Sequence, residues 1–216
     1  MRLKGTPVAI AAGATLALAA VAWAAVITGT PGNDVLRGTN DGDEIRALAG
    51  DDLVYARAGS DLVRAGSGDD GVRAADGQDV VYGGHGRDLI AGGDGADRVH
   101  GGSDSDSLSG GDGADRVSGN KGADAVSGND GDDSLFGGWG ADRVYGGRGD
   151  DVLHALAADG DPDLLACGPG DDIAFVLRSE RPTTRLVDCE TLYVVVELTD
   201  DQAEGENSDA DAEADG

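Results

Sequence analysis

Fourteen aspartates recur every nine residues from Asp34 to Asp151, with no insertion or deletion between them. Carboxylates repeated this regularly offer oxygen ligands to a hard divalent cation. Val, Leu or Ile stands two positions after every one of these aspartates. Gly stands two positions before twelve of them, with Asp41 and Asp104 as the exceptions. Three features that hold one phase over so many units mark a repeat architecture.

The repeating stretch, Gly29 to His154, reads as fourteen units of the form G-G-x-G-x-D-x-U-x, where U is aliphatic. Glycines at positions 1, 2 and 4 predict a turn, because they accept positive φ and close backbone approach. The last three positions, x-U-x, predict a very short strand with one buried face. Two units then close one turn of a flattened coil, and fourteen units give seven turns.

Direct stacking places unit n over unit n+2 and aligns the position 6 aspartates in two columns. A cation between neighbouring carboxylates removes their repulsion. Calcium takes six to eight oxygens in irregular geometry, whereas magnesium demands a stricter octahedron and zinc prefers nitrogen and sulfur. We therefore expect calcium, one ion per n/n+2 pair and up to about twelve ions. The predicted ligand residues are Asp88, Asp97, Asp106, Asp115, Asp124, Asp133, Asp142 and Asp151, with glycines Gly83, Gly86, Gly92, Gly95, Gly110, Gly113, Gly137, Gly140, Gly146 and Gly149.

Units seven to fourteen, residues 83–154, form a strong block in which five units carry the full pattern. Units one to six, residues 29–82, form a worn block. Its position 1 is Ala in four units and its position 2 is mostly not Gly. A Cβ at positive φ costs about 1 kcal/mol or more. We therefore expect weaker calcium binding at Asp34, Asp43, Asp52, Asp61, Asp70 and Asp79.

The unit resembles the hemolysin-type (RTX) calcium-binding repeat, most clearly at Gly83–Ala91 and Gly92–His100. The resemblance implies calcium as the ligand. With the turn-and-strand pattern, it predicts an all-β fold: a right-handed parallel β-roll of about seven turns with a disulfide-pinned C-terminal cap. The run Cys167 to Asp172, C-G-P-G-D-D, is similar to the turn that follows the repeats in some secreted actinobacterial-type RTX proteins.

Three other interpretations of the acidic and glycine-rich composition are disfavoured. A disordered Gly/Asp tract requires no aliphatic residue at every ninth place, and collagen needs glycine at every third. Asp159, Asp161 and Asp163 are spaced like the start of an EF-hand loop. That loop would need Gly where Leu164 stands and Glu where Gly170 stands.

Residues 1–24 read as a secretory signal peptide, with a positive start, an Ala-rich apolar run and an A-x-A site before Ala25. An uncleaved N-terminal anchor is the alternative. The roll is expected over residues 25–154, with its first strand beginning at 25–28. We therefore expect the protein to be extracellular, possibly at the cell surface, in calcium-rich surroundings.

After His154 the register breaks with an insertion over 155–166, and a degenerate fifteenth unit follows at 168–173. We expect residues 155–199 to cap the roll, because a solenoid needs its open end covered. Cys167 and Cys189 are the only cysteines, so one disulfide is expected. Residues 200–216 hold eight acidic residues and no basic one, which predicts an acidic disordered tail.

A formal net charge of -26 argues against nucleic acid and anionic membrane partners. His85, His100 and His154 have no partner set at catalytic spacing, so no enzyme activity is expected. The leading hypothesis is a secreted protein that folds on binding calcium. The alternative is a calcium-stiffened adhesion protein with an unknown protein or glycan partner. It would need an aromatic ladder on one outer face, and only the pairs Tyr82/His100 and Phe136/His154 are recognisable.

Overall fold

The computed structural model describes residues 8–9 and 24–196 of the chain. Every regular element in this part is a β-strand, and none of it forms a helix long and apolar enough to cross a membrane. The predicted signal peptide and acidic tail lie outside the described residues, apart from 8–9 and 24. The structure therefore does not test those two expectations.

The strands form two parallel sheets. From β2 onward the even-numbered strands belong to one sheet and the odd-numbered strands to the other. Sheet A contains β1 (Val8–Ala9), β2 (Val26–Thr28), β4 (Glu44–Ala49), β6 (Leu62–Ser67), β8 (Val80–His85), β10 (Arg98–Ser103), β12 (Arg116–Lys121), β14 (Ser134–Trp139), β16 (Val152–Ala155), β18 (Ile173–Leu177) and β20 (Thr191–Val195). Sheet B contains β3 (Val35–Arg37), β5 (Leu53–Ala58), β7 (Gly71–Asp76), β9 (Leu89–Asp94), β11 (Ser107–Asp112), β13 (Ala125–Asp130), β15 (Arg143–Arg148), β17 (Leu164–Ala166) and β19 (Arg185–Val187).

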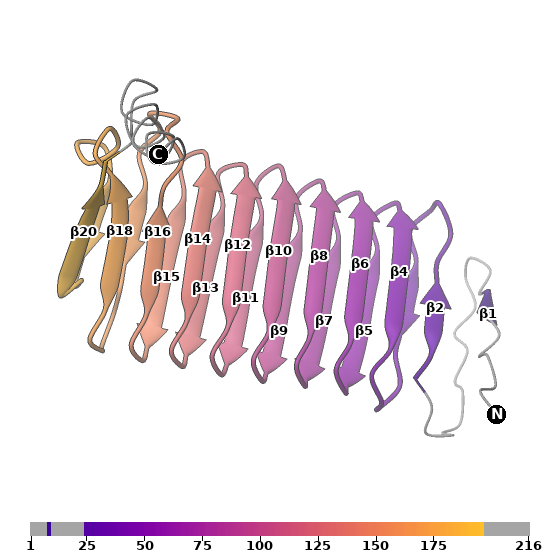
Figure 1. Ribbon diagram of the computed structural model, residues 1–216. Helices are drawn as coiled ribbons and strands as arrows, with labels where there is room; N and C mark the ends of the chain where they lie inside the picture. The colour runs from indigo at the N-terminus through magenta and orange to yellow at the C-terminus, as the bar shows by residue number, and fades with distance from the viewer. Residues whose placement is uncertain (1–7, 10–23, 197–216) are drawn as a thin grey trace, which may run out of the picture.

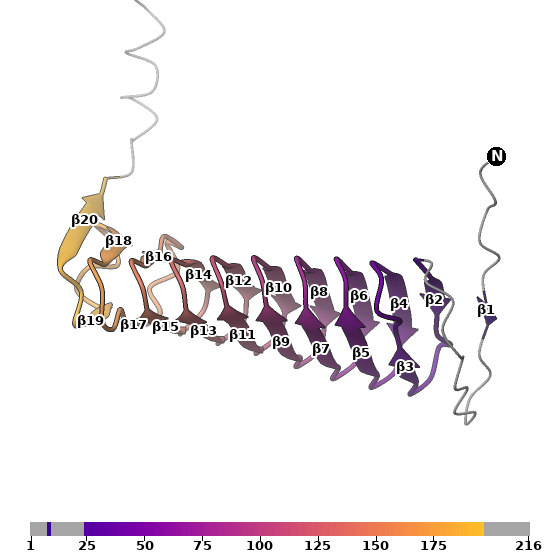
Figure 2. The same ribbon diagram turned by 90° about the horizontal axis from the view of Figure 1, so that it is seen from below.

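The chain passes from one sheet to the other at every unit, so that successive turns stack into a flattened roll (Figure 1). Each unit pairs with the unit eighteen residues away. Val99, for example, faces Val81 on one side and Val117 on the other. Figure 2 shows the turns edge-on, with the two sheets enclosing a thin interior. This confirms the predicted all-β parallel roll and the stacking of unit n over unit n+2.

The core is two facing ladders of aliphatic side chains. The position 8 residues are buried in all fourteen units, as Ile45, Val99 and Leu153 illustrate. Position 1 also points inward, and in the worn block it is filled by the fully buried Ala47, Ala56, Ala65 and Ala74. Because the interior is one side chain thick on each sheet, few apolar contacts stabilise each turn.

Two details of the prediction are corrected. The typical strand spans six residues instead of three, because positions 1 to 3 of the next unit continue the pairing of x-U-x. The turn is therefore confined to positions 4 to 6. The roll also has about nine turns instead of seven, because β17 to β20 continue both sheets beyond the last repeat.

Candidate metal centre

All fourteen position 6 aspartates are buried, with at most 8 % of their surface exposed. They stack in two columns that run the length of the roll. Within a column, the backbone N–H of each aspartate donates to Oδ1 of the aspartate one turn further on, at 2.6–3.0 Å. Column 1 contains Asp34, Asp52, Asp70, Asp88, Asp106, Asp124 and Asp142, and column 2 contains Asp43, Asp61, Asp79, Asp97, Asp115, Asp133 and Asp151.

The second carboxylate oxygen of these side chains is buried without a donor. Among the described residues, Oδ2 has no hydrogen-bond partner in twelve consecutive units, from Asp52 to Asp151. A buried unpaired polar oxygen costs about 1–3 kcal/mol, and more if it is charged. Twelve repetitions of that cost in one fold indicate a missing positively charged partner.

Each unpartnered Oδ2 in the strong block lies against the position 1 glycine of its own unit, at the point where a β-carbon would stand; we call this point, which carries no side chain, the hollow. A β-carbon built on Gly92 would clash with Oδ2 of Asp97 and with the carbonyl oxygen of Gly110 in the next turn. Gly83, Gly119 and Gly128 show the same arrangement. The hollow is thus lined by oxygens from two successive turns, which is the donor set that calcium prefers.

Side chains alone do not complete such a site. Within residues 24–196, no three His, Cys, Asp or Glu side chains come together as a metal-binding group. Each centre would therefore combine the carboxylates of two neighbouring aspartates with backbone carbonyls, as the sequence predicts. This donor set fits calcium, and the position 6 aspartates with carbonyls of the position 1 and position 4 glycines stay the predicted residues that would hold it.

The glycines at position 4 have a different task from those at position 1. Gly86, Gly95, Gly113, Gly140 and Gly149 all have φ between 105° and 138°, which is the left-handed region that side chains avoid. They turn the chain sharply so that the following aspartate points inward. The position 1 glycines have ordinary φ and are required instead for the space they leave.

Burial raises the pKa of the column aspartates from Asp52 to Asp151 above the usual value of 3.8. Desolvation is the main cause, and the neighbouring carboxylates in the column add to it. The pKa rises to about 7 at Asp88, Asp106, Asp133 and Asp142, and to about 6 at Asp115, Asp124 and Asp151. A dication between the carboxylates opposes both causes, so cation and protons compete for these groups.

The worn block keeps the columns but changes the hollow. In units three to six the methyl group of Ala47, Ala56, Ala65 or Ala74 occupies position 1, where the strong block has glycine and close-lying oxygens. Oδ2 of the aspartate in each of these units remains unpartnered within the described chain. The oxygen is available, but the volume beside it is partly filled.

Units one and two satisfy their carboxylates internally. The backbone N–H of Thr30 donates to Oδ2 of Asp34 at 2.5 Å, and its hydroxyl donates to the same atom at 3.0 Å. Thr39 makes the equivalent pair of bonds to Asp43, at 2.6 Å to Oδ2 and 3.1 Å to Oδ1. These two carboxylates therefore need no cation to complete their hydrogen bonding.

From unit three onward, position 2 takes a left-handed backbone, whereas Thr30 and Thr39 in units one and two do not. Leu48, Arg57 and Ala75 take φ of 91°, 89° and 86° in place of glycine. Asn120 and Asn129 do the same in the strong block, at 75° and 83°, where Asn tolerates this conformation better. The worn block thus carries three strained residues that the strong block lacks.

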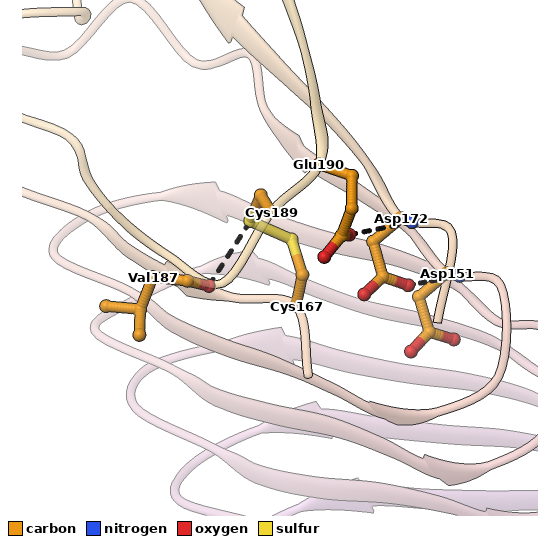
Figure 3. Close-up of a disulfide and its surroundings, with 6 residues drawn as sticks. All are labelled: Asp151, Cys167, Asp172, Val187, Cys189 and Glu190. Atoms are coloured by element: carbon orange, nitrogen blue, oxygen red, sulfur yellow. Dashed lines mark hydrogen bonds between the residues drawn. A yellow bond between two sulfur atoms is a disulfide. The ribbon is translucent and has the colours of Figure 1, made fainter. Parts of the chain in front are cut away.

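Both columns continue beyond the last repeat, through the predicted degenerate unit 168–173 and through a turn at Asp163 that the sequence did not predict. The N–H of Asp142 donates to Oδ1 of Asp163, and that of Asp151 donates to Oδ1 of Asp172. Glu190 ends column 2 by accepting from the N–H of Asp172 at 3.0 Å (Figure 3). Asp163 therefore stands at position 6 of a turn that is three residues longer. Its place in the column explains this aspartate without an EF-hand. The signal was the D-x-U-x run 163–166, hidden by the change of period.

The predicted disulfide is present in these last turns. Cys167 and Cys189 are bonded, with Cα atoms 5.1 Å apart, and Cys167 is fully buried. Figure 3 shows the bond beside the end of column 2, where Asp151, Asp172 and Glu190 lie in line. The bond ties the turn after β17 to the chain that leads into β20.

Comparison with protein families matches the chain to the RTX calcium-binding nonapeptide repeat (4 copies). The matches cover residues 28–63, 37–72, 64–99, 92–126 and 118–153, which is more than half of the chain. The chain belongs to this family. No curated protein matches it. The family matches stop just before His154, so the extra column members Asp163, Asp172 and Glu190 lie outside them.

Proposed function

We propose that this RTX repeat protein is secreted and that its roll folds when calcium ions bind along the two aspartate columns. The observation that carries the proposal is the buried, unpartnered Oδ2 repeated in twelve consecutive units. A fold that buries this many Oδ2 atoms without hydrogen-bond donors is incomplete until a cation joins them. Secretion rests on the N-terminal sequence and on the extracellular supply of calcium.

Folding and binding are coupled because the metal-free roll is poorly stabilised. Ordering each residue costs about 1–2 kcal/mol of conformational entropy, and the glycine-rich turns cost more. The thin aliphatic ladders offset part of this, while the stacked carboxylates oppose it. Ions that bind only the folded roll shift the equilibrium by mass action.

The strong block holds the tighter sites, at Asp88 to Asp151, and the worn block holds weaker ones at Asp34 to Asp79. The pairs Asp142/Asp163 and Asp151/Asp172 extend the columns by two sites beyond the twelve expected from the repeats. Extracellular calcium modules work at roughly 10⁻⁴–10⁻³ M, and we expect that range here.

The alternative, a calcium-stiffened interaction protein, gains one observation. Phe136, His154, Phe175 and Tyr193 form a continuous stack on the outer face of sheet A, with ring centroids 4.2–5.1 Å apart. However, the rings lie nearly parallel and cover one another's faces. A sugar ring stacks on an aromatic face, so this ladder offers little to a glycan. It supports adhesion less than its length suggests.

Circular dichroism of the chain starting at Ala25, recorded during a calcium titration, tests the proposal. The β-sheet signal should appear between about 0.1 and 1 mM calcium, vanish with EDTA, and not return with magnesium. A roll already fully folded without calcium and insensitive to millimolar calcium would overturn it. A catalytic role is not part of the proposal, since no residue set in the sequence suggests one.

A further inference from the structure

The outer face of sheet A differs in charge from the rest of this acidic chain. Positions 7 and 9 of β6 to β20 point outward and include no Asp or Glu, although the chain has 42 acidic and 16 basic residues. Sheet B contrasts with it, because the exposed Asp76, Asp94, Asp112 and Asp130 stack in register along β7 to β13. Sheet A has no such row, because its corresponding residues are Ser67, His85, Ser103, Lys121 and Trp139, so it is the face better suited to attract an anion.

Two arginines lie at the centre of this face. Arg98 and Arg116 are register partners on β10 and β12, both exposed, and neither forms an ion pair with any residue in 24–196. Like charges on adjacent strands are destabilising unless something neutralises them. The guanidinium of Arg116 lies 4.1 Å above the ring of Phe136, which holds it on the face.

The surroundings of the two arginines favour an anionic occupant. They line a depression of about 200 Å³ whose only carboxylates, Asp97 and Asp115, are buried in column 2. Calcium in that column would neutralise both, so this step rests on the proposed function. The aromatic stack that starts at Phe136 directs ring edges outward, and ring edges carry the partial positive charge.

The chain itself supplies a matching anion. Residues 197–216 contain nine Asp or Glu and no Lys, Arg or His, and they follow β20, the last strand of sheet A. β20 lies four strands from β12, or about 19 Å at 4.8 Å per strand. Twenty residues extend to about 66–72 Å, and a random coil of that length averages about 25 Å end to end. Tethering at this range gives effective concentrations near the millimolar level.

We propose that the acidic segment 197–216 docks on the outer face of sheet A, centred on Arg98 and Arg116, and covers it reversibly. An external polyanion must then displace the tail before it can bind there. The tail keeps this cationic patch from non-specific association, and it leaves when a stronger anionic partner competes.

Energy transfer from Trp139 to the tail tests this directly, because Trp139 is exposed on β14 of the same sheet. The chain starting at Ala25 has Trp139 as its single tryptophan and carries an acceptor dye on Ser208→Cys, with the Cys167–Cys189 bond kept oxidised. In calcium, transfer should be high. It should fall in Arg98→Gln/Arg116→Gln to the level seen in 1 M salt, where the Debye length is about 3 Å. Arg73→Gln/Arg143→Gln, on sheet B, is the matched control and should keep the transfer.

A second measurement asks whether the tail competes. A variant with the nine acidic residues of 197–216 changed to Asn or Gln should bind polyglutamate at least about tenfold more tightly than the wild type. Equal affinities, or transfer unchanged by the double arginine variant, would refute the docking. Transfer that grows with protein concentration would assign the contact to a second copy and also refute it. Circular dichroism of each variant in calcium shows separately whether the roll has folded.

Discussion

Units three to six and units seven to fourteen have the same backbone path, the same aspartate columns and the same aliphatic ladders, yet they differ beside the carboxylate. The strong block leaves a hollow above a position 1 glycine, whereas the worn block fills it with an alanine methyl group. Positions 6 and 8 therefore specify the roll, and we expect position 1 to decide whether a cation fits. A solenoid can lose binding strength without losing its shape.

The largest effect that we expect comes from acidification, which should stabilise the metal-free roll and weaken the binding of calcium. Burial raises the folded-state pKa to about 7 at Asp88 and about 6 at Asp70, above the ordinary 3.8. Protonation therefore favours the metal-free roll: this stabilisation is complete below about pH 4 and is lost as the pH rises through about 7. Calcium must displace those protons. Its affinity therefore falls, as the pH is lowered, by up to about tenfold per pH unit for each proton displaced.

Calcium titrations followed by circular dichroism at pH 8, 6.5 and 5 measure both effects. We expect the metal-free signal to grow, and the calcium midpoint to move to higher concentration, as the pH falls. A calcium midpoint independent of pH over this range would mean that the carboxylates are already ionised in the folded protein, contrary to the pKa values.

Removal of single carboxylates separates the blocks. Asp115 belongs to two predicted sites in column 2, with Asp97 and with Asp133. At ten to a hundred times its Kd, an ion contributes about 1.4–2.7 kcal/mol, so Asp115→Ala should cost about 3–5 kcal/mol in calcium. Asp43→Ala should change the calcium midpoint much less, because Thr39 already satisfies that carboxylate.

Calorimetric titration counts the sites in both variants. Asp115→Ala should lose two sites from column 2 and leave column 1 occupied, with Asp106→Ala as the equivalent change in column 1. Equal losses in Asp115→Ala and Asp43→Ala would remove the distinction between strong and worn blocks.

Much of this architecture was predictable because the period of nine never slips between Asp34 and Asp151. A constant period fixes which residues stack, so the columns, the buried position 8 ladder and the neighbours Phe136 and His154 all follow from counting. The disulfide followed from the presence of just two cysteines in a chain with a predicted signal peptide.

Structural features that do not follow from the nine-residue period could not be predicted. Strand length was underestimated because glycine propensity suggests a turn at positions 1 to 3, whereas cross-strand pairing holds these residues in the sheet. Asp163 and Asp172 were separated from the columns by turns three residues longer than the repeat. The hollow above position 1 depends on atomic distances between two turns, which no spacing of residues expresses.

The C-terminal turns offer a covalent counterpart to the metal-stabilised blocks. The bond between Cys167 and Cys189 closes a loop of about 20 residues, which contributes roughly 3 kcal/mol. Cys167→Ser/Cys189→Ser should lower the stability of the calcium-bound protein by up to that amount and leave the number of strong-block ions unchanged. Denaturant unfolding and calorimetric titration measure the two quantities. Loss of ions from the strong block would show that the end and the repeats fold as one cooperative unit.

Exchanging one methyl group between the blocks is the smallest and sharpest test. Gly92→Ala places a methyl in the hollow beside Asp97 and the Gly110 carbonyl. It should abolish one strong site at a cost of about 1–3 kcal/mol in calcium.

Ala65→Gly restores the full G-G-x-G-x-D pattern in unit five and should add one strong site. The new glycine costs about 0.5–1 kcal/mol of entropy, so the net gain in calcium is about 1 kcal/mol. Ala123→Gly, at position 5 of its turn, is the matched control because it adds the entropy without opening a hollow. Both primary changes are read as ion stoichiometry by calorimetry, and an unchanged count in either would show that position 1 does not decide binding.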